Sequence, residues 1–372
     1  MTDPSIVIAA ITTRVPSFSY TPAETLSAIN TWAKDLPPHD LRRIINIFEN
    51  TPIKNRHSII GFEQLFRLRS ISQMAQAYEK NAIEHGTAIL HDLMEQNQIL
   101  PKEIDYLITT SCTGFMIPSF DAYLIENLGL KKNTRRLPIT EVGCSAGAAS
   151  LLYAHDLLRG NPHKIVAIIN LEFPSNTFQL QDFSLENVVA MALFADGISA
   201  SLVCSKETMK KRQMSLPRGY LEIIDTDMCQ IPRSTEILGY HLVDTGLKMN
   251  LDRTLPMLIA EHWPQIVGDF LDRNNLGFKD VGHYLLHPGG TKIIDTIEDK
   301  LISYGKNLRE TREIMMSYGN LSSATLGFIT QHYLSHTDHQ EGDLALLMAF
   351  GPGFTAHQLL TRWRPSNEDN KS

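Results

Sequence analysis

The sequence predicts a layered α/β fold built from two βαβ-rich halves. Short apolar runs, typical of buried strands, alternate with longer segments in which apolar residues recur every three or four positions, as in helices. This alternation occurs twice, on either side of the polar run Ser205–Arg218. Alternating strands and helices pack as helical layers over a sheet, which favours a layered arrangement. We expect one half at residues 1–218 and the other at residues 219–372, joined by a solvated linker or hairpin at the polar run.

The first half opens with a strand. Ile6–Ile11 is apolar throughout, and because an acidic residue precedes it without a basic leader, it fits a strand better than a signal peptide. Further apolar runs predict strands at Tyr106–Thr110, Leu137–Thr140, Lys164–Leu171 and Ile198–Val203. Helical spacing predicts helices at Ile71–Gln96, Asp121–Leu128 and Ser145–Gly160. The stretch between the first strand and residue 70 is polar and dotted with prolines, and it carries the basic cluster Arg42, Arg43, Lys54 and Arg56.

The second half repeats the pattern. Strands are expected at the apolar runs Leu221–Ile224, His283–His287 and Leu344–Phe350, of which the last would be the final strand. Helices are expected where apolar residues keep a helical period: Leu255–Leu271, Lys292–Leu301, Leu308–Met316 and Ser323–His336.

The composition excludes several classes of protein. Of 372 residues, 43% are hydrophobic and 20% charged, which is enough apolar material for a substantial core. The formal net charge of −7, without a long basic block, argues against nucleic-acid binding, because phosphate contacts need clustered cations. No apolar run approaches the ~20 residues of a membrane span. Four cysteines in a chain of this length are too few for a disulfide scaffold, and none of them form a C-x-x-C pair: Cys112, Cys144, Cys204 and Cys229. We therefore expect free thiols and a cytoplasmic location.

Cys144 is the strongest candidate for a reactive group. It lies where a predicted strand passes into the helix from Ser145, among small residues such as Gly143 and Gly147. Small neighbours let a substrate approach closely, and the positive end of a helix would lower the pKa of the thiol. A thiolate there could attack a thioester. The alternative is a buried structural cysteine.

His287 and Asn320 are weaker candidates when each is taken alone. His287 ends a buried strand before a glycine turn, where α/β folds place catalytic groups, but it could equally be a hydrogen-bonded core histidine. Asn320 follows Gly319 between two helical segments, and it could be an ordinary turn residue or a helix cap.

Two other patterns carry less information. The turn Phe-Gly-Pro-Gly-Phe from Phe350 lacks the spacing of a phosphate-binding loop. His332, His336 and His339 lack the carboxylate that accompanies histidines in zinc signatures, so a solvated helix face is the favoured interpretation and no metal site is expected.

Together these segments resemble the type III polyketide synthases, the chalcone synthase-like branch of the thiolase-fold condensing enzymes. The matching segments follow the family's order: TTSCTGFMIPS, GCSAG, ALFADG, LLHPGG, YGNLSSAT and AFGPGFTA. The separations of 143 residues between Cys144 and His287 and 33 between His287 and Asn320 also fit the family. The form TSCTGF is similar to the bacterial branch, which includes phloroglucinol, tetrahydroxynaphthalene and alkylpyrone synthases.

The resemblance implies a thiolase-like fold of five layers, αβαβα, a homodimer, and a catalytic set of Cys144, His287 and Asn320. Cys144 would carry the acyl chain, with His287 holding it as a thiolate–imidazolium pair. His287 and Asn320 would stabilise the enolate formed when malonyl-CoA loses carbon dioxide. The partners would be malonyl-CoA and an acyl-CoA starter. No metal or organic cofactor would be needed, because the CoA thioesters are themselves the substrates.

The resemblance also implies substrate-binding residues. Phe194 matches a gatekeeper phenylalanine, and Met249 takes the place of a second one. Other positions along the cavity or tunnel are Cys112, Thr113, Pro174, Tyr240, Ser322, Gly289 and Gly290. Tyr240 replaces a glycine of chalcone synthase, so we expect a smaller cavity.

The CoA-binding cations match the family only in part. Arg43 falls on one of three positions that carry cations in the plant enzymes, whereas Asn46 and Asn50 occupy the other two.

The predicted activity is iterative decarboxylative condensation of malonyl-CoA on a Cys-bound starter, followed by cyclisation to a small aromatic or pyrone product, phloroglucinol-like or a short alkylpyrone. Three alternatives remain open. They are a long-chain alkylpyrone or alkylresorcinol synthase, a ketoacyl synthase III-like enzyme of fatty-acid synthesis, and an acyl-CoA thioesterase.

Overall fold

A nine-stranded mixed sheet organises the chain in the computed structural model, which describes residues 3–67, 70–214, 216–287 and 289–366. Pro288, in the predicted glycine turn after His287, lies outside the described residues. Across the sheet the strands are β11 (His283–His287), β12 (Leu344–Gly351), β13 (Thr355–Arg364), β8 (Tyr220–Gln230), β1 (Ile6–Arg14), β7 (Gly197–Ser205), β6 (Ile165–Glu172), β4 (Tyr106–Thr110) and β5 (Arg135–Ile139).

The sheet has two parts with the same pattern of pairing. β1 pairs antiparallel with β7, β7 antiparallel with β6, and β6 parallel with β4. Likewise β8 pairs antiparallel with β13, β13 antiparallel with β12, and β12 parallel with β11. The parts join where Ile6–Ile8 of β1 pairs with Leu221–Ile223 of β8. This repetition explains why the strand–helix pattern occurs twice in the sequence.

Helices cover the outer face of each sheet part, and further helices lie between the two parts. The α-helices are α1 (Pro22–Trp32), α2 (Pro38–Glu49), α3 (Phe62–Leu65), α4 (Ile71–Gln96), α5 (Asp121–Asn127), α6 (Ala146–Gly160), α7 (Leu185–Leu193), α8 (Lys206–Lys211), α9 (Leu255–Arg273), α10 (Thr291–Leu301), α11 (Arg309–Tyr318) and α12 (Thr325–His336). Short 3₁₀ turns are η1 (Pro101–Glu103), η2 (Gly143–Ser145), η3 (Pro174–Thr177), η4 (Ile302–Tyr304) and η5 (Ser322–Ala324).

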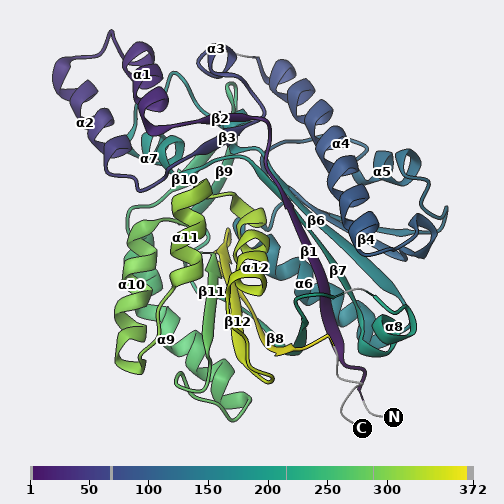
Figure 1. Cartoon of the computed structure of the whole chain (residues 1–372). Helices are drawn as coiled ribbons and strands as arrows, with labels where there is room; N and C mark the ends of the chain where they lie inside the picture. Colours follow the sequence, from purple (N-terminus) through teal and green to yellow (C-terminus); the bar gives the residue numbers. More distant parts are fainter. Residues whose placement is uncertain (1–2, 68–69, 215, 288, 367–372) are drawn as a thin grey trace.

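The helices and the two sheet parts stack in five layers (Figure 1). Three clusters of buried side chains lie between these layers. One lies between α4 and the sheet part that contains β1, β7, β6 and β4. The second surrounds the central helices α6 and α12 between the two sheet parts, and the third lies between the other part and α9 and α10. Neighbouring residues of a strand point to opposite faces, so Leu285 of β11 belongs to the central cluster and Leu286 to the outer one. The predicted αβαβα fold is confirmed.

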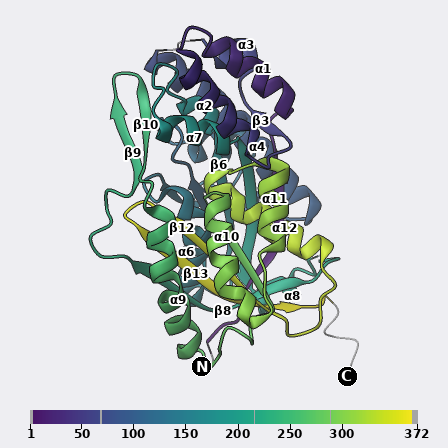
Figure 2. The same cartoon turned by 90° about the vertical axis from the view of Figure 1, so that its left-hand side faces the viewer.

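Two additions lie outside these layers. Helices α1 and α2 pack on α7 through a separate apolar cluster. The two-stranded hairpin of β9 (Leu238–Val243) and β10 (Gly246–Leu251) projects from the body of the molecule (Figure 2). A further short pair consists of β2 (Phe18–Tyr20) and β3 (Arg56–Ser58). Across the described residues, no helix combines the length and apolar character that a membrane span would require.

The predicted elements are present, although β8 extends to Gln230 and two expectations need correction. Leu344–Phe350 is not the final strand, because β13 follows the glycine turn and its polar residues, such as Gln358 and Thr361, hide it from a search for apolar runs. The polar run Ser205–Arg218, expected to be a solvated linker or hairpin, contains the short helix α8. The proline-dotted stretch before residue 70, where no element was predicted, contains α1, α2 and α3.

Gly147 lets the two central helices approach each other. A Cβ added there would lie 2.3 Å from the carbonyl oxygen of Ser323, a backbone atom that cannot turn aside. We expect Gly147→Ala to lower the free energy of unfolding by about 1–3 kcal/mol, the usual cost of overpacking. Gly160, in the last turn of the same helix, has no atom within 4 Å of an added Cβ, so Gly160→Ala is the matched control. Denaturant unfolding that gives both variants the stability of the unmodified protein would contradict this packing.

Candidate active site

Three residues that are distant in the sequence meet at one cavity of about 400 Å³. Cys144 lies in η2 directly before α6, His287 ends β11, and Asn320 lies between α11 and η5. All three side chains line this cavity. The structural repeat explains why Cys144 and Asn320 meet, because η2 and η5 precede the two central helices, which pack against each other.

Asn320 and Ser322 form a hydrogen-bonded turn against Cys144. The Asn320 side-chain amide donates to the carbonyl oxygen of Gly289 (2.8 Å), and its Oδ1 accepts from the backbone N–H of Ser322 (2.8 Å). Ser322 has a φ of 51°, a left-handed conformation that residues other than glycine seldom adopt. Its Oγ lies 3.3 Å from the sulfur of Cys144. Since a primary amide carries two N–H groups, the second can donate to a bound substrate.

Phe194 is held beside Asn320 by the backbone. The N–H of Ala195 donates to the carbonyl oxygen of Asn320 (2.9 Å), and the N–H of Asn320 donates to that of Leu193 (2.8 Å). The ring of Phe194 is 5% exposed and lines the cavity. A shift of this aromatic wall would therefore also displace Asn320.

The Phe-Gly-Pro-Gly-Phe turn supports the turn that carries Cys144. A Cβ added at Gly351 would lie 2.3 Å from Oγ of Ser145, and one added at Gly143 would lie 2.5 Å from Cδ of Pro352. Gly143 also has a φ of 60°. These glycines allow the two turns to pack closely, which gives the motif a packing role.

Glu172 is a buried carboxyl group that sequence analysis missed. It ends β6, is fully buried, and accepts hydrogen bonds from the backbone N–H of Cys112 (3.1 Å), Oγ1 of Thr113 (3.0 Å) and Oγ of Ser323 (2.5 Å). Burial raises the pKa of Glu172 despite these donors. The available signal was a single acid ending the otherwise uncharged run from Ile165.

The pKa shift at Cys144 is opposite to the one expected from its place at a helix start. Burial raises the pKa of the thiol to about 12, although the hydrogen bond with Ser322 lowers it. Burial also lowers the pKa of His287 to about 4, and neither ring nitrogen has a hydrogen-bond partner among the described residues. Burial disfavours the charged form of each side chain taken alone, and for Cys144 this outweighs the stabilisation expected from the helix end. The thiolate–imidazolium pair that the resemblance implies stays a prediction.

Alkylation of Cys144 by iodoacetamide measures this protonation state. Because the pKa of about 12 lies above the assay range, the thiolate fraction and the rate should rise about tenfold per pH unit between about pH 6 and pH 9. The rate follows from mass spectrometry of the peptide that contains Cys144. A rate that stays level over this range would contradict the neutral pair, because a preformed thiolate gives a plateau.

A second cavity, of about 420 Å³, adjoins the first and shares Leu238 with it. Cys112, Gly143 and Tyr240 line it. Tyr240 of β9 is the register partner of Met249 of β10, so the two predicted cavity residues lie side by side on the hairpin.

The other predicted site residues are distributed around these cavities. Gly289 and Gly290 line the first one. Thr113, Pro174 and Met249 do not appear in the lining of either cavity, as far as the described residues define it. Arg43 lies on α2 in a shallow outer groove, where its guanidinium is 3.6 Å from Asp40.

The three predicted surface histidines do not gather around a common point for a metal. His332 pairs with Glu313 at 2.6 Å, whereas His339 contacts the carbonyl oxygen of Tyr333.

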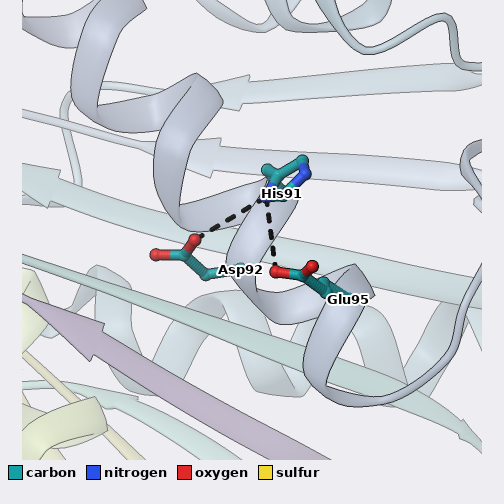
Figure 3. Close-up of side chains that lie close together, drawn as sticks. All are labelled: His91, Asp92 and Glu95. Atoms are coloured by element: carbon teal, nitrogen blue, oxygen red, sulfur yellow. Dashed lines mark ion pairs between the residues drawn. The ribbon is translucent and has the colours of Figure 1, made fainter.

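A different cluster brings His91, Asp92 and Glu95 together on the surface of α4 (Figure 3). Nδ1 of His91 lies 3.7 Å from Asp92 and 3.9 Å from Glu95, while Arg14 pairs with Asp92 at 2.9 Å. Because an arginine already neutralises one carboxylate and the groups are largely exposed, the cluster has the character of a surface ion-pair network.

Comparisons with known proteins give one consistent result. A family model described as FAE1/type III polyketide synthase-like protein matches residues 16–218, and the C-terminal domain of chalcone and stilbene synthases matches residues 223–364. A putative chalcone synthase of Bacillus subtilis (strain 168) is 30% identical over 329 residues, 87% of this chain and 90% of that protein. The phloroglucinol synthase of Pseudomonas fluorescens is 30% identical over 319 residues, 84% of this chain and 87% of that protein. The crystal structure of 1,3,6,8-tetrahydroxynaphthalene synthase from Streptomyces coelicolor A3(2), a bacterial type III polyketide synthase, is similar with a TM-score of 0.87 at 27% identity, covering 96% of this chain and 99% of that one.

Proposed function

Because the chain belongs to the type III polyketide synthases, a family of condensing acyltransferases, we propose that it extends a starter acyl group on Cys144 with malonyl-CoA. The observation that carries this proposal is the meeting of a thiol, an imidazole and an amide in one cavity. These are the groups that covalent acyl transfer and enolate stabilisation require. The condensing activity would be iterative, and cyclisation would release the product.

Acyl loading begins from the neutral pair. The sulfur of Cys144 attacks the thioester carbonyl of the starter while its proton passes to His287, so that the thiolate exists only during the reaction. The C–S bond to coenzyme A then breaks, and the departing thiolate takes the proton back from His287. The acyl group is left on Cys144 and both side chains are again uncharged.

Condensation uses His287 and Asn320 as hydrogen-bond donors. A neutral imidazole carries one N–H, and it donates together with the second N–H of Asn320 to the thioester carbonyl of malonyl-CoA. The bond to the carboxylate breaks, carbon dioxide leaves, and the electron pair becomes the enolate. The enolate carbon attacks the acyl carbonyl on Cys144, forms the new C–C bond and expels the Cys144 thiolate, which takes up one proton from water to restore the neutral thiol. The lengthened chain on coenzyme A can then return to Cys144.

The product we propose is a small aromatic or pyrone compound. Tyr240 supports this, because its ring lines the second cavity where a glycine would leave it larger. The similarity to a phloroglucinol synthase and a tetrahydroxynaphthalene synthase points the same way. A long-chain alkylpyrone or alkylresorcinol would require a longer channel. The substrates would be malonyl-CoA and an acyl-CoA starter, with no further cofactor. We also propose a homodimer, in which a second copy would cover the side chains of Phe115 and Ile117, which are 69% and 82% exposed.

Tyr240→Gly tests the limit on product size. We expect longer or additional polyketides, because removal of the ring enlarges the second cavity by the volume of one aromatic side chain. Leu242→Gly, in the same strand with a side chain that is 75% exposed, controls for the effect of a glycine in the hairpin. The measurement is the product distribution by liquid chromatography and mass spectrometry. If Tyr240→Gly and the unmodified protein give the same distribution, Tyr240 does not limit chain length.

Incubation with malonyl-CoA, alone and with acyl-CoA starters of graded length, tests the function itself. Mass spectrometry should detect polyketide masses and identify the preferred starter. Coenzyme A released with free acid and no new C–C bond would indicate a thioesterase. Condensation restricted to carrier-protein thioesters would indicate a ketoacyl synthase III-like enzyme.

A further inference from the structure

Two cations of the second half line the cavity that contains Cys144. Arg253 follows β10, and Lys292 lies in the first turn of α10. Both residues are exposed, and among the described residues no carboxylate forms an ion pair with either, although hydrogen bonds from Thr254 and, to a smaller extent, the charge of Arg253 lower the pKa of the neighbouring Asp252. They are therefore available to an anionic ligand that enters this cavity.

The rest of the cavity suits a molecule with one charged end. Its wall is mostly apolar, with Ile47, Leu185, Val189, Leu193, Leu251 and Ile293. The acids in the lining are Glu186 and Asp252, and Oδ1 of Asp252 already accepts from the backbone and hydroxyl of Thr254 (2.7 and 2.6 Å). A ligand with a thioester at one end, a neutral arm and a phosphate-rich end would place its groups against Cys144, the apolar wall and the two cations.

The cations of helix α2 are less well placed to bind such a phosphate-rich end. Its cations Arg42 and Arg43 lie in the outer groove, which shares only Ile47 and Asn50 with the cavity. Arg43 also lies beside Asp40, and its guanidinium donates to the carbonyl oxygen of Phe183 (3.4 Å).

We propose that Arg253 and Lys292 bind the phosphates of the coenzyme A portion of the substrate, so that the second half supplies most of the anion-binding charge. The inference rests on the proposed function, in which CoA thioesters are the substrates. Arginine matches phosphate oxygens with a planar pair of donors, and lysine supplies a point charge. On a chain of net charge −7, such local cations are needed to offset the general repulsion of an anionic ligand.

Calorimetric titration with coenzyme A tests this assignment. We expect Arg253→Ala and Lys292→Ala each to raise the Kd about threefold to tenfold, with the double variant near the product of the two effects. Potassium chloride should weaken binding to the unmodified protein more than to the double variant, because salt screens exposed charges. Lys300→Ala, in the last turn of α10 and outside the cavity lining, is the matched control and should leave the Kd unchanged.

Ligands without phosphates separate charge recognition from a structural effect. Pantetheine should bind the double variant as it binds the unmodified protein. In turnover, the variants should raise KM for malonyl-CoA with little change in kcat, and leave the reaction of the malonyl N-acetylcysteamine thioester unchanged. Equal Kd values for coenzyme A in all proteins would overturn the inference, as would a larger loss in Arg43→Ala than in the double variant. Absence of condensation in the unmodified protein with every thioester would instead count against the proposed function, while the Kd values still test the cations.

Discussion

Cys144→Ala is expected to abolish polyketide formation, with kcat lower by at least about 10³-fold. Loss of a covalent nucleophile removes the acyl-enzyme route entirely, and such losses in comparable enzymes span several orders of magnitude. Cys144 lines the cavity together with His287 and Asn320, and no other cysteine is among the described residues that line it. Intact-protein mass spectrometry should show a starter acyl adduct on the unmodified protein and none on the variant. Slow release of carbon dioxide from malonyl-CoA should remain, because His287 and Asn320 are still present.

Two other cysteines make this result specific, one as a control variant and one as the alternative site of acylation. Cys229→Ala removes a partly buried thiol of β8 that lines neither cavity within the described chain, and it should keep the full rate. Cys112 is the thiol that could be acylated in place of Cys144, because its sulfur lies 3.7 Å from Oγ of Ser322, the hydroxyl that also contacts Cys144. Peptide mapping should locate the acyl group on Cys144. An adduct on Cys112, or unchanged turnover in Cys144→Ala, would refute the assignment of the nucleophile.

Local pattern predicts most elements of the large sheet and the helices packed on it, whereas the three central residues needed the family resemblance as well. The helix at Ile71–Gln96 was predicted at its observed bounds, because apolar spacing over 26 residues leaves little ambiguity. Cys144, His287 and Asn320 each lie at a recognisable strand end or turn, and their order along the chain matches a known family. The structure then places them around one cavity, as that family resemblance implied.

Contacts between distant segments leave no local pattern in the sequence, so they could not be predicted from it. The hydrogen bond from Ser323 to Glu172 joins residues 151 positions apart, and nothing near Glu172 in the sequence indicates its partner. Arg253 and Lys292 likewise have no local motif, since only the folded chain brings them to the cavity. The pKa of Cys144 shifts in the direction opposite to the one expected, because the helix end is visible in the sequence, whereas the burial that raises the pKa is not.

Asn320→Asp should separate decarboxylation from acyl loading. An aspartate keeps the size of the side chain and an oxygen that can accept from the N–H of Ser322, but it loses both N–H donors. It also places negative charge where the enolate develops. We therefore expect release of carbon dioxide from malonyl-CoA to fall about 10²- to 10³-fold, the usual cost of removing one oxyanion donor.

The rate of acyl-enzyme formation is compared with the rate of carbon dioxide release in the same variant. Loading of Cys144 does not use the amide of Asn320, so the acyl adduct should still form at a similar rate. Asn307→Asp is the matched control, because the Asn307 side chain also accepts from a backbone N–H two residues onward, that of Arg309 (3.1 Å), but lies on the exposed surface before α11. This control should lose neither step. If Asn320→Asp releases carbon dioxide at the full rate but no longer forms the acyl adduct, Asn320 acts in loading and the enolate must be stabilised by other groups.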